Sequence, residues 1–173
     1  MAKSDSFFIR AKVTVTGVTY NQTEIDLGSF VNLGVTKSTL LRVHNVQAQY
    51  LDNDDKGSMI YYDGGIPGGM LRWQLSTQTQ AALIDASDKS YVTGGVYEQA
   101  STTGNLVQTS SQTSDANPMD WQNGYLVGVD SIFLGADSSA TWDNGPIDIC
   151  IVLECTLENA TQASATALAL SQQ

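Results

Sequence analysis

The stretch PIDICIVLECTLENAT, residues 146–161, decides the fold class. Every second residue from Ile147 is apolar, and the set is Ile147, Ile149, Ile151, Leu153, Cys155 and Leu157. The alternate positions are mostly polar and include Asp148, Glu154 and Glu158. A side-chain period of two is typical of a strand with one buried face and one solvent-facing face. The stretch therefore predicts a long strand whose apolar face lies in the core, with its acidic residues in solvent or at an interface.

The same stretch contains both cysteines of the chain, Cys150 and Cys155, five positions apart. In a strand this odd spacing puts them on opposite faces, about 17 Å apart at ~3.3 Å per residue. A disulfide needs Cα atoms roughly 4.4–6.8 Å apart, so the two residues cannot bond to each other or hold one metal ion. We expect two free thiols, with Cys155 in the core.

The length of 173 residues suits a single domain with a substantial core. The N-terminus lacks the charged and then apolar pattern of a signal peptide. No apolar run approaches the roughly 18 residues of a membrane-spanning helix. Two unpaired cysteines are typical of a reducing compartment. These features predict a protein that is made in the cytoplasm and not secreted through a signal peptide.

The net charge of −10 is unevenly distributed along the chain. Residues 1–89 carry eight basic and nine acidic residues, whereas residues 90–173 carry nine acidic residues and no Lys or Arg. Nucleic-acid binding begins with a basic footprint, so we expect no direct contact with nucleic acid. The split is explained equally well by solubility and by assembly with charge-complementary neighbours. In such an assembly, the residues expected to meet the acidic half of a neighbouring copy are Arg10, Lys12, Arg42 and Arg72.

Further strands are predicted wherever apolar residues alternate, namely over residues 7–15, 23–35, 38–52, 70–76, 89–99 and 125–137. In 38–52 the apolar register slips by one position near His44 and Asn45, which predicts a β-bulge. The last of these segments is apolar on both faces, as expected of a central strand. Residues 77–88 are the only internal segment with helical spacing. The polar residues 100–124 are expected to form a long loop that is functional or covered by a partner.

Seven to nine strands separated by Gly-rich turns predict an all-β fold, a jelly-roll-like antiparallel β-sandwich with at most one or two short helices. We expect one such domain over residues 7–158, between an N-terminal tail of residues 1–6 and a C-terminal tail of residues 159–173. The C-terminal tail contains Leu168 and Leu170, which would be exposed unless a helix or a neighbouring subunit covers them. We expect these leucines to contribute to self-assembly.

The candidate metal sites are weak. His44 is the only histidine, whereas zinc sites usually draw on several, so we interpret it as structural. Four residues match positions 1, 3, 6 and 12 of an EF-hand-like calcium loop, and these are Asp52, Asp54, Gly57 and Asp63. Lys56 occupies position 5, where a ligand is needed, and no helix is expected on either side. We interpret the segment as an acidic turn and keep calcium binding as an alternative.

Three tryptophans are candidates for stacking on sugars. Trp73 alternates in step with Leu71 and Leu75, which predicts a core position. Trp121 and Trp142 lie in predicted loops, where aromatic side chains serve sugar binding and protein interfaces equally well. The chain contains no Gly-rich phosphate loop and no G-x-S-x-G nucleophile elbow. We therefore predict no catalytic, cofactor-binding or metal-binding residues and no small-molecule substrate.

Three predicted strands, FFIRAKVTVTG, STLLRVHNVQAQYLD and PIDICIVLECTLENAT, are separated by long loops. In this arrangement residues 7–158 resemble the single jelly-roll capsid proteins of tailless icosahedral viruses, by architecture and without a diagnostic motif. The resemblance implies a virion shell protein that forms capsomers with copies of itself around a packaged genome. The acidic charge of the chain favours packing against other virion proteins or a membrane over packing against bare nucleic acid. Two alternatives stay open, namely a carbohydrate-binding or adhesive sandwich and a phage tail or decoration protein. An enzyme is the least favoured class.

Overall fold

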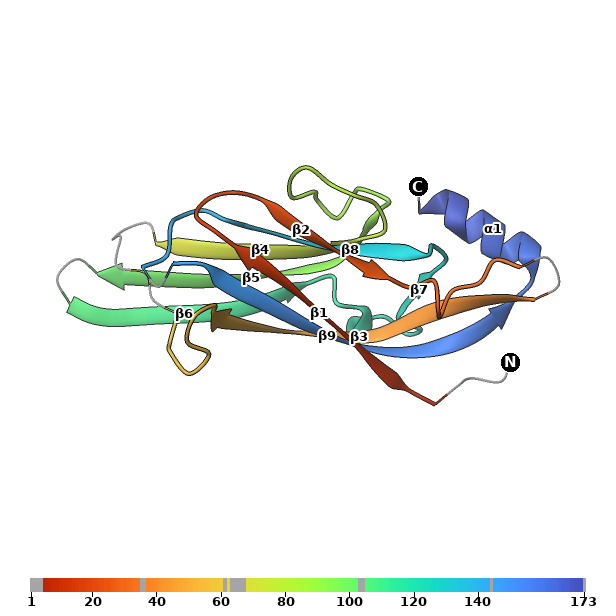
Figure 1. Ribbon diagram of the computed structural model, residues 1–173, viewed down its shortest axis with the longest axis horizontal. Helices are drawn as coiled ribbons and strands as arrows, with labels where there is room; N and C mark the ends of the chain where they lie inside the picture. Colours follow the sequence, from red (N-terminus) through yellow and green to blue (C-terminus); the bar gives the residue numbers. More distant parts are fainter. Residues whose placement is uncertain are drawn as a thin grey trace.

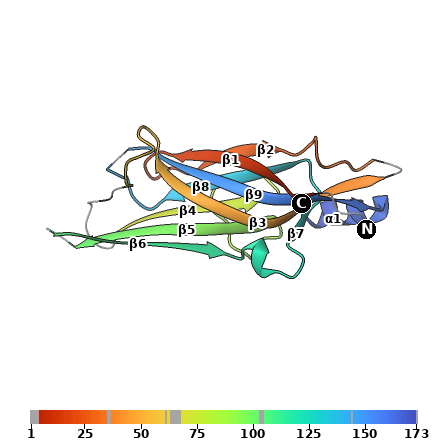
Figure 2. The ribbon, with the colours of Figure 1, turned by 90° about the horizontal axis from the view of Figure 1, so that it is seen from below.

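A computed structural model of the chain describes residues 5–34, 37–60, 62, 68–102, 105–143 and 145–172. Two antiparallel sheets face each other, and one α-helix lies at an end of the sandwich (Figures 1 and 2). The elements in chain order are β1 Phe7–Val15, β2 Asn21–Asp26, β3 Ser38–Asp52, β4 Gly69–Ser76, β5 Tyr91–Thr102, β6 Asn105–Asp115, the 3-10 helix η1 Pro118–Asp120, β7 Tyr125–Val127, β8 Ser131–Ser138, β9 Ile147–Ala160 and α1 Gln162–Ser171. The predicted β-sandwich is confirmed.

The strands pair in the nested order of a jelly roll. One sheet has the order β1-β9-β3-β7, and the other has the order β2-β8-β4-β5-β6. If β6 is left out, the first strand pairs with the last, the second with the next to last, and so on inward through β3 with β7 and β4 with β5. A long antiparallel hairpin rolled up on itself produces this nesting, which contains two Greek keys. The jelly-roll prediction is therefore confirmed as well.

The strand predicted from residues 146–161 is β9, which lies between β1 and β3. Five of the six residues on its apolar face are buried as the alternation predicts, and these are Ile147, Ile149, Ile151, Leu153 and Cys155. Leu157, the last of the six, is only half-buried. Leu153 is paired with Ile9 on one side and with Val46 on the other. The space between the sheets is filled mainly by aliphatic side chains of this kind.

The predicted bulge in β3 is present. The pairing of β3 with β9 shifts between Val43 and Asn45, so His44 is the extra residue. Because of the shift, Val43 and Val46 both face the core. Gly124 lies against the bulge with φ +62°, and a Cβ atom there would be 2.3 Å from the carbonyl oxygen of Val43. Only glycine fits this position, since both the backbone angle and the space exclude a side chain.

Several segments differ from their predictions. The strand expected over 23–35 is shorter, because β2 ends at Asp26 and turns follow. Residues 125–137 form two strands, β7 in one sheet and β8 in the other, so their two apolar faces reflect the crossing of the chain between sheets. The loop expected over 100–124 instead contains β6, which pairs with β5, followed by η1.

No helix forms in residues 77–88. Instead, the side chain of Gln74, on β4, forms hydrogen bonds with main-chain groups of this segment. Its Oε1 accepts a hydrogen bond from the main-chain N–H of Ile84 at 2.7 Å, and its Nε2 donates to the carbonyl oxygen of Ala82 at 3.1 Å. Gln74 is buried beneath the segment, which therefore covers part of the outer surface of the second sheet.

The C-terminal segment folds back on its own subunit. Thr161 caps α1 by accepting a hydrogen bond from the N–H of Ser164. Beyond the helix, the carbonyl oxygen of Gln172 accepts from the Thr77 hydroxyl at 2.7 Å, and its side-chain Nε2 donates to the carbonyl oxygen of Leu126 at 2.7 Å. Thr77 follows a strand of one sheet and Leu126 belongs to the other, so Gln172 ties the two sheets together.

In the described residues, no helix has the length and apolar character needed to cross a bilayer.

Candidate functional site

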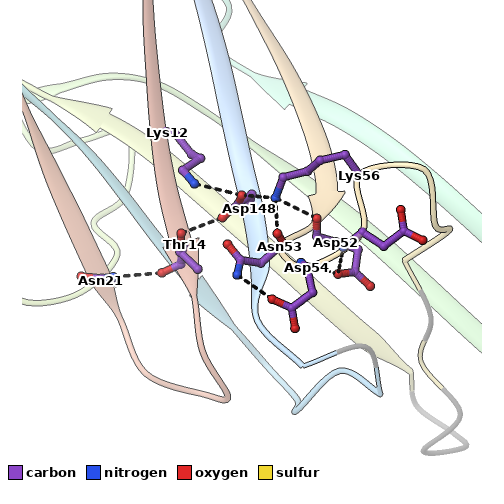
Figure 3. Close-up of polar contacts among 9 residues, drawn as sticks. Lys12, Thr14, Asn21, Asp52, Asn53, Asp54, Lys56 and Asp148 are labelled. Atoms are coloured by element: carbon purple, nitrogen blue, oxygen red, sulfur yellow. Dashed lines mark hydrogen bonds and ion pairs between the residues drawn. The ribbon is translucent and has the colours of Figure 1, made fainter.

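The polar face of β9 differs from its prediction at Asp148, which is fully buried rather than exposed. The carboxylate accepts hydrogen bonds from Lys12 Nζ at 3.0 Å, Lys56 Nζ at 2.6 Å and Thr14 Oγ1 at 2.6 Å (Figure 3). Lys12 and Thr14 lie on β1, whereas Lys56 lies in the turn after β3. Three segments therefore meet at one carboxylate, which we name the Asp148 cluster.

The same cluster accounts for the calcium-like sequence. Lys56 Nζ also donates to the carbonyl oxygens of Asp52 and Asn53, at 2.9 and 2.6 Å. Asp52 Oδ1 accepts hydrogen bonds from the N–H groups of Asp54 and Asp55, so it caps the turn. The oxygens of this turn thus surround an ammonium group, which favours the acidic-turn interpretation. Asp63, the last position of the calcium motif, lies outside the described residues.

Acid should weaken the Asp148 cluster. Burial raises the pKa of Asp148, but the hydrogen bonds from Lys56, Thr14 and Lys12 outweigh it and hold this pKa below the ordinary 3.8. A carboxyl group whose pKa is lower in the folded state stabilises the fold above its unfolded pKa, and the contribution is lost as the pH falls through the folded value. We expect the free energy of unfolding, measured in urea, to fall below pH 3.8 more steeply than in Asp148→Asn.

The control for this titration is Asp120→Asn, which removes an exposed carboxylate from η1 and should keep the wild-type acid dependence. Identical acid dependence in the wild type and in Asp148→Asn would show that the cluster contributes nothing through its charge.

A second acid of β9, Glu158, is also buried, contrary to its expected exposure. Arg42 Nε and Nη2 donate to its two carboxylate oxygens at 2.5 and 2.7 Å, and the side chains of Arg42 and Glu158 are 15% and 9% exposed. The third nitrogen, Nη1, donates to the carbonyl oxygen of Asn123 at 2.5 Å. Bonding to Glu158 raises the pKa of Arg42. This two-bond geometry is the strong form of an arginine–carboxylate pair.

These pairs alter the interpretation of the charge split. Lys12 and Arg42, expected to meet a neighbouring subunit, are bonded to Asp148 and Glu158 of their own chain. Their acidic partners belong to the half of the sequence that carries no basic residue. The complementarity between the halves is thus used inside the fold at these two positions. The Lys12 side chain is nevertheless 52% exposed, so contact of these cations with a neighbouring subunit stays a prediction. Arg10 and Arg72 are exposed.

His44 and the cysteines have structural surroundings. His44 Nε2 lies 2.9 Å from Thr156 Oγ1, which joins the bulge of β3 to β9. Cys150 and Cys155 are both free, and Cys150 is half-buried on the opposite face from the fully buried Cys155. Within the described residues, no three His, Cys, Asp or Glu side chains are grouped to hold a metal ion.

The thiols should react slowly in the folded protein. Burial raises the pKa of both, and it raises that of Cys155 to about 12. Because the thiolate is the reactive form, we expect little alkylation before unfolding and complete alkylation of both cysteines afterwards. Intact mass spectrometry under non-reducing conditions measures this. A peptide in which Cys150 is linked to Cys155 would contradict the strand geometry.

Two of the three tryptophans are in the interior. Trp73, expected there, is 3% exposed and donates from Nε1 to the hydroxyl of Tyr50 at 2.9 Å. Trp142, expected in a loop, is also 3% exposed and donates to Ser138 Oγ at 2.9 Å. The sugar-stacking hypothesis is therefore wrong for Trp142. Trp121 is 42% exposed, with its ring centroid 5.9 Å from that of Tyr125.

An open groove lies between α1 and the outer surface of the first sheet, with a volume of about 680 Å³. Leu40, Leu126 and Leu168 line it, and the Arg42–Glu158 pair is part of its wall. Sequence reasoning missed this groove because it treated residues 159–173 as a tail. The available signal was Thr161, a capping residue followed by a run of Ala and Leu that starts a helix.

No protein-family model and no curated protein matches the chain, whereas solved structures do. VP1 of the Trichodysplasia spinulosa-associated polyomavirus, in complex with 3'-sialyllactose, has a TM-score of 0.46 and 10% identity over 87% of this chain and 94% of its own. Merkel cell polyomavirus VP1, in complex with disialyllactose, has a TM-score of 0.46 and 9% identity over 90% and 95%. A structure of Desmodium yellow mottle tymovirus matches with a TM-score of 0.29 and 6% identity, over 91% of this chain and 89% of its own. The chain resembles these jelly-roll capsid proteins in fold alone.

Proposed function

We propose that this chain is a self-assembling shell subunit of a virion, with copies of itself and other virion proteins as partners. The observation that carries the proposal is the nested strand order around a filled interior. Jelly rolls with this order serve as viral capsid domains, lectins and cupins. A fold alone does not determine function, because function depends on the sites that a fold carries. The surroundings of the candidate residues therefore have to distinguish a capsid domain from a lectin or a cupin.

The interior argues against a ligand-binding barrel. Aliphatic side chains from both sheets occupy the space between them, and Trp73 and Trp142 extend this packing. The groove beside α1 lies outside the sandwich and is mostly apolar. Among the candidate side chains, His44, Asp52, Trp73 and Trp142 serve packing and hydrogen bonding. Trp121 is exposed. A structural role suits this arrangement better than catalysis.

The surface carries exposed apolar side chains that can form contacts between subunits. Among the residues whose side chains the structure describes, seven large apolar ones are exposed. They lie on an edge strand, in a connection between strands or on α1, and they are Phe8, Val18, Leu33, Met59, Met119, Trp121 and Leu170. Apolar and aromatic residues supply the core of contacts between subunits. The net charge of −10 supports packing against proteins or a membrane rather than against bare nucleic acid.

The test is the mass of the assembled particle. Purified subunits are followed by light scattering and by sedimentation velocity over a series of concentrations and salt concentrations. Particles of many subunits support the proposal, and salt should change the rate of assembly more than its end point, because charge steers encounters more than it adds affinity. A strictly monomeric species at every concentration and salt level overturns it.

The carbohydrate-binding alternative now rests on Trp121, the one exposed tryptophan of the three. A monomer whose glycan binding is abolished by Trp121→Ala would favour this alternative over the shell.

A further inference from the structure

The two sheets present four edge strands, β1, β7, β2 and β6. An edge strand exposes a row of unpaired N–H and C=O groups, and proteins block such edges with charges, proline or very short strands. β1 carries Arg10 and Lys12, β2 carries Glu24 and Asp26, and β7 has three residues. β6 has 11 residues, NLVQTSSQTSD, without Lys, Arg or Pro. It is therefore the one long edge among the described strands that lacks these protections.

The charge pattern of the chain sets β6 apart in a second way. Residues 99–114 contain no charged residue, although the chain as a whole has a net charge of −10. A contact with two-fold symmetry sets the same strand of two copies against itself. At β2 such a contact would bring together two copies of Glu24 and Asp26. At β6 only Asp115, the last residue of the strand, carries charge.

The position of β6 leaves room for another strand. Its backbone pairs with β5 on one side, from Gly94 opposite Asp115 to Thr102 opposite Asn105, and it is the last strand of its sheet. The hairpin of β5 and β6 extends beyond the other strands at one end of the sandwich (Figures 1 and 2). Strand addition at such an edge obtains its affinity from main-chain hydrogen bonds.

We propose that β6 pairs antiparallel with β6 of a second copy, about a two-fold axis, so that two five-stranded sheets become one continuous sheet. The proposal rests on the proposed function, since it names one of the contacts by which the shell subunit assembles. A second copy is the occupant that the charges favour, because it offers an edge that is equally long and equally uncharged.

The first experiment compares two lysine substitutions that change the net charge equally. Ser110→Lys places a cation on β6, where two copies would oppose each other, and Thr23→Lys places one on β2. Sedimentation equilibrium of each full chain should show dimerisation weakened about tenfold or more by Ser110→Lys, with Thr23→Lys close to the wild type. Equal dimerisation of the two variants overturns the proposal. Thermal unfolding of both variants verifies that they fold.

A second experiment tests the pairing directly. Single cysteines are placed one at a time at positions 107–113 in a Cys150→Ser background and oxidised. Pairing about a two-fold axis should give a disulfide-linked dimer that is strongest at the residues nearest the axis and falls off on either side. No linked dimer at any position overturns the proposal.

The outcomes separate this proposal from the shell function. If Ser110→Lys forms large particles as well as the wild type does, the proposed β6 contact is wrong and the proposed shell function is retained. A β6-linked dimer that grows no further supports the contact and defeats the shell. A wild-type chain that stays monomeric at every concentration defeats both.

Discussion

Replacing Arg42 by alanine should lower the free energy of unfolding by about 3–5 kcal/mol, because it removes one partner of a buried ion pair. Glu158 would keep its charge at a position where its side chain is 9% exposed and would lose both hydrogen bonds from the guanidinium group. The carbonyl oxygen of Asn123 would lose a donor as well. Urea unfolding followed by circular dichroism measures the difference.

Arg10→Ala is the matched control, since it removes the same charge from an exposed position. Its contact is with the ring of Phe8, 5.9 Å from the centroid, and we expect a loss of about 0.5–1 kcal/mol. The double variant Arg42→Ala with Glu158→Ala should recover part of the stability, because no carboxylate is then left buried. If Arg42→Ala costs no more than Arg10→Ala, the pair does not stabilise the fold.

Leu153→Ala should cost about 2–5 kcal/mol, as expected for a leucine that leaves a cavity in a packed core. Leu153 is fully buried at the centre of β9, between Ile9 and Val46 of the neighbouring strands. The same unfolding experiment applies. Val152→Ala, one position away on the opposite and half-buried face, should cost about 1 kcal/mol. Similar losses for the two variants would mean that the faces of β9 have been assigned incorrectly.

The strands that sequence reasoning identified are those with an apolar face. In β9 the alternation from Ile147 onward predicts both the strand and its buried side, because a period of two has no other simple explanation. The slip at His44 similarly predicts the bulge. β6 was missed because its residues offer no apolar alternation, and it is a strand only through its pairing with β5.

Polar contacts between residues distant in sequence could not be predicted from the local alternation of residues along one strand. Asp148 and Glu158 alternate with apolar residues, so they are expected in solvent or at an interface. Their partners Lys12 and Arg42 lie 136 and 116 positions away in the sequence. Spacing along one strand contains no information about which cation a neighbouring strand will bring. The Asp148 cluster and the pair in the wall of the groove therefore became visible only in three dimensions.

The false helix in residues 77–88 has a related cause. Ala82, Leu83 and Ala86 have helical spacing, but Gln74 of β4 binds the N–H of Ile84 and the carbonyl oxygen of Ala82. A helix of this length is marginal without tertiary support, so competing hydrogen bonds from a buried side chain prevail.

The central position of β9 also has a consequence for the order of events during synthesis. β1 is made at the start of the chain, yet the strand that joins it to β3 ends at residue 160. A ribosome adds roughly 5–20 residues per second, so β1 and β3 wait for seconds without the strand that belongs between them. Contacts between residues so distant in sequence also close slowly, over about milliseconds to seconds in sheet proteins. We expect the nascent chain to depend on chaperones until β9 emerges, and the first sheet to form in one late step.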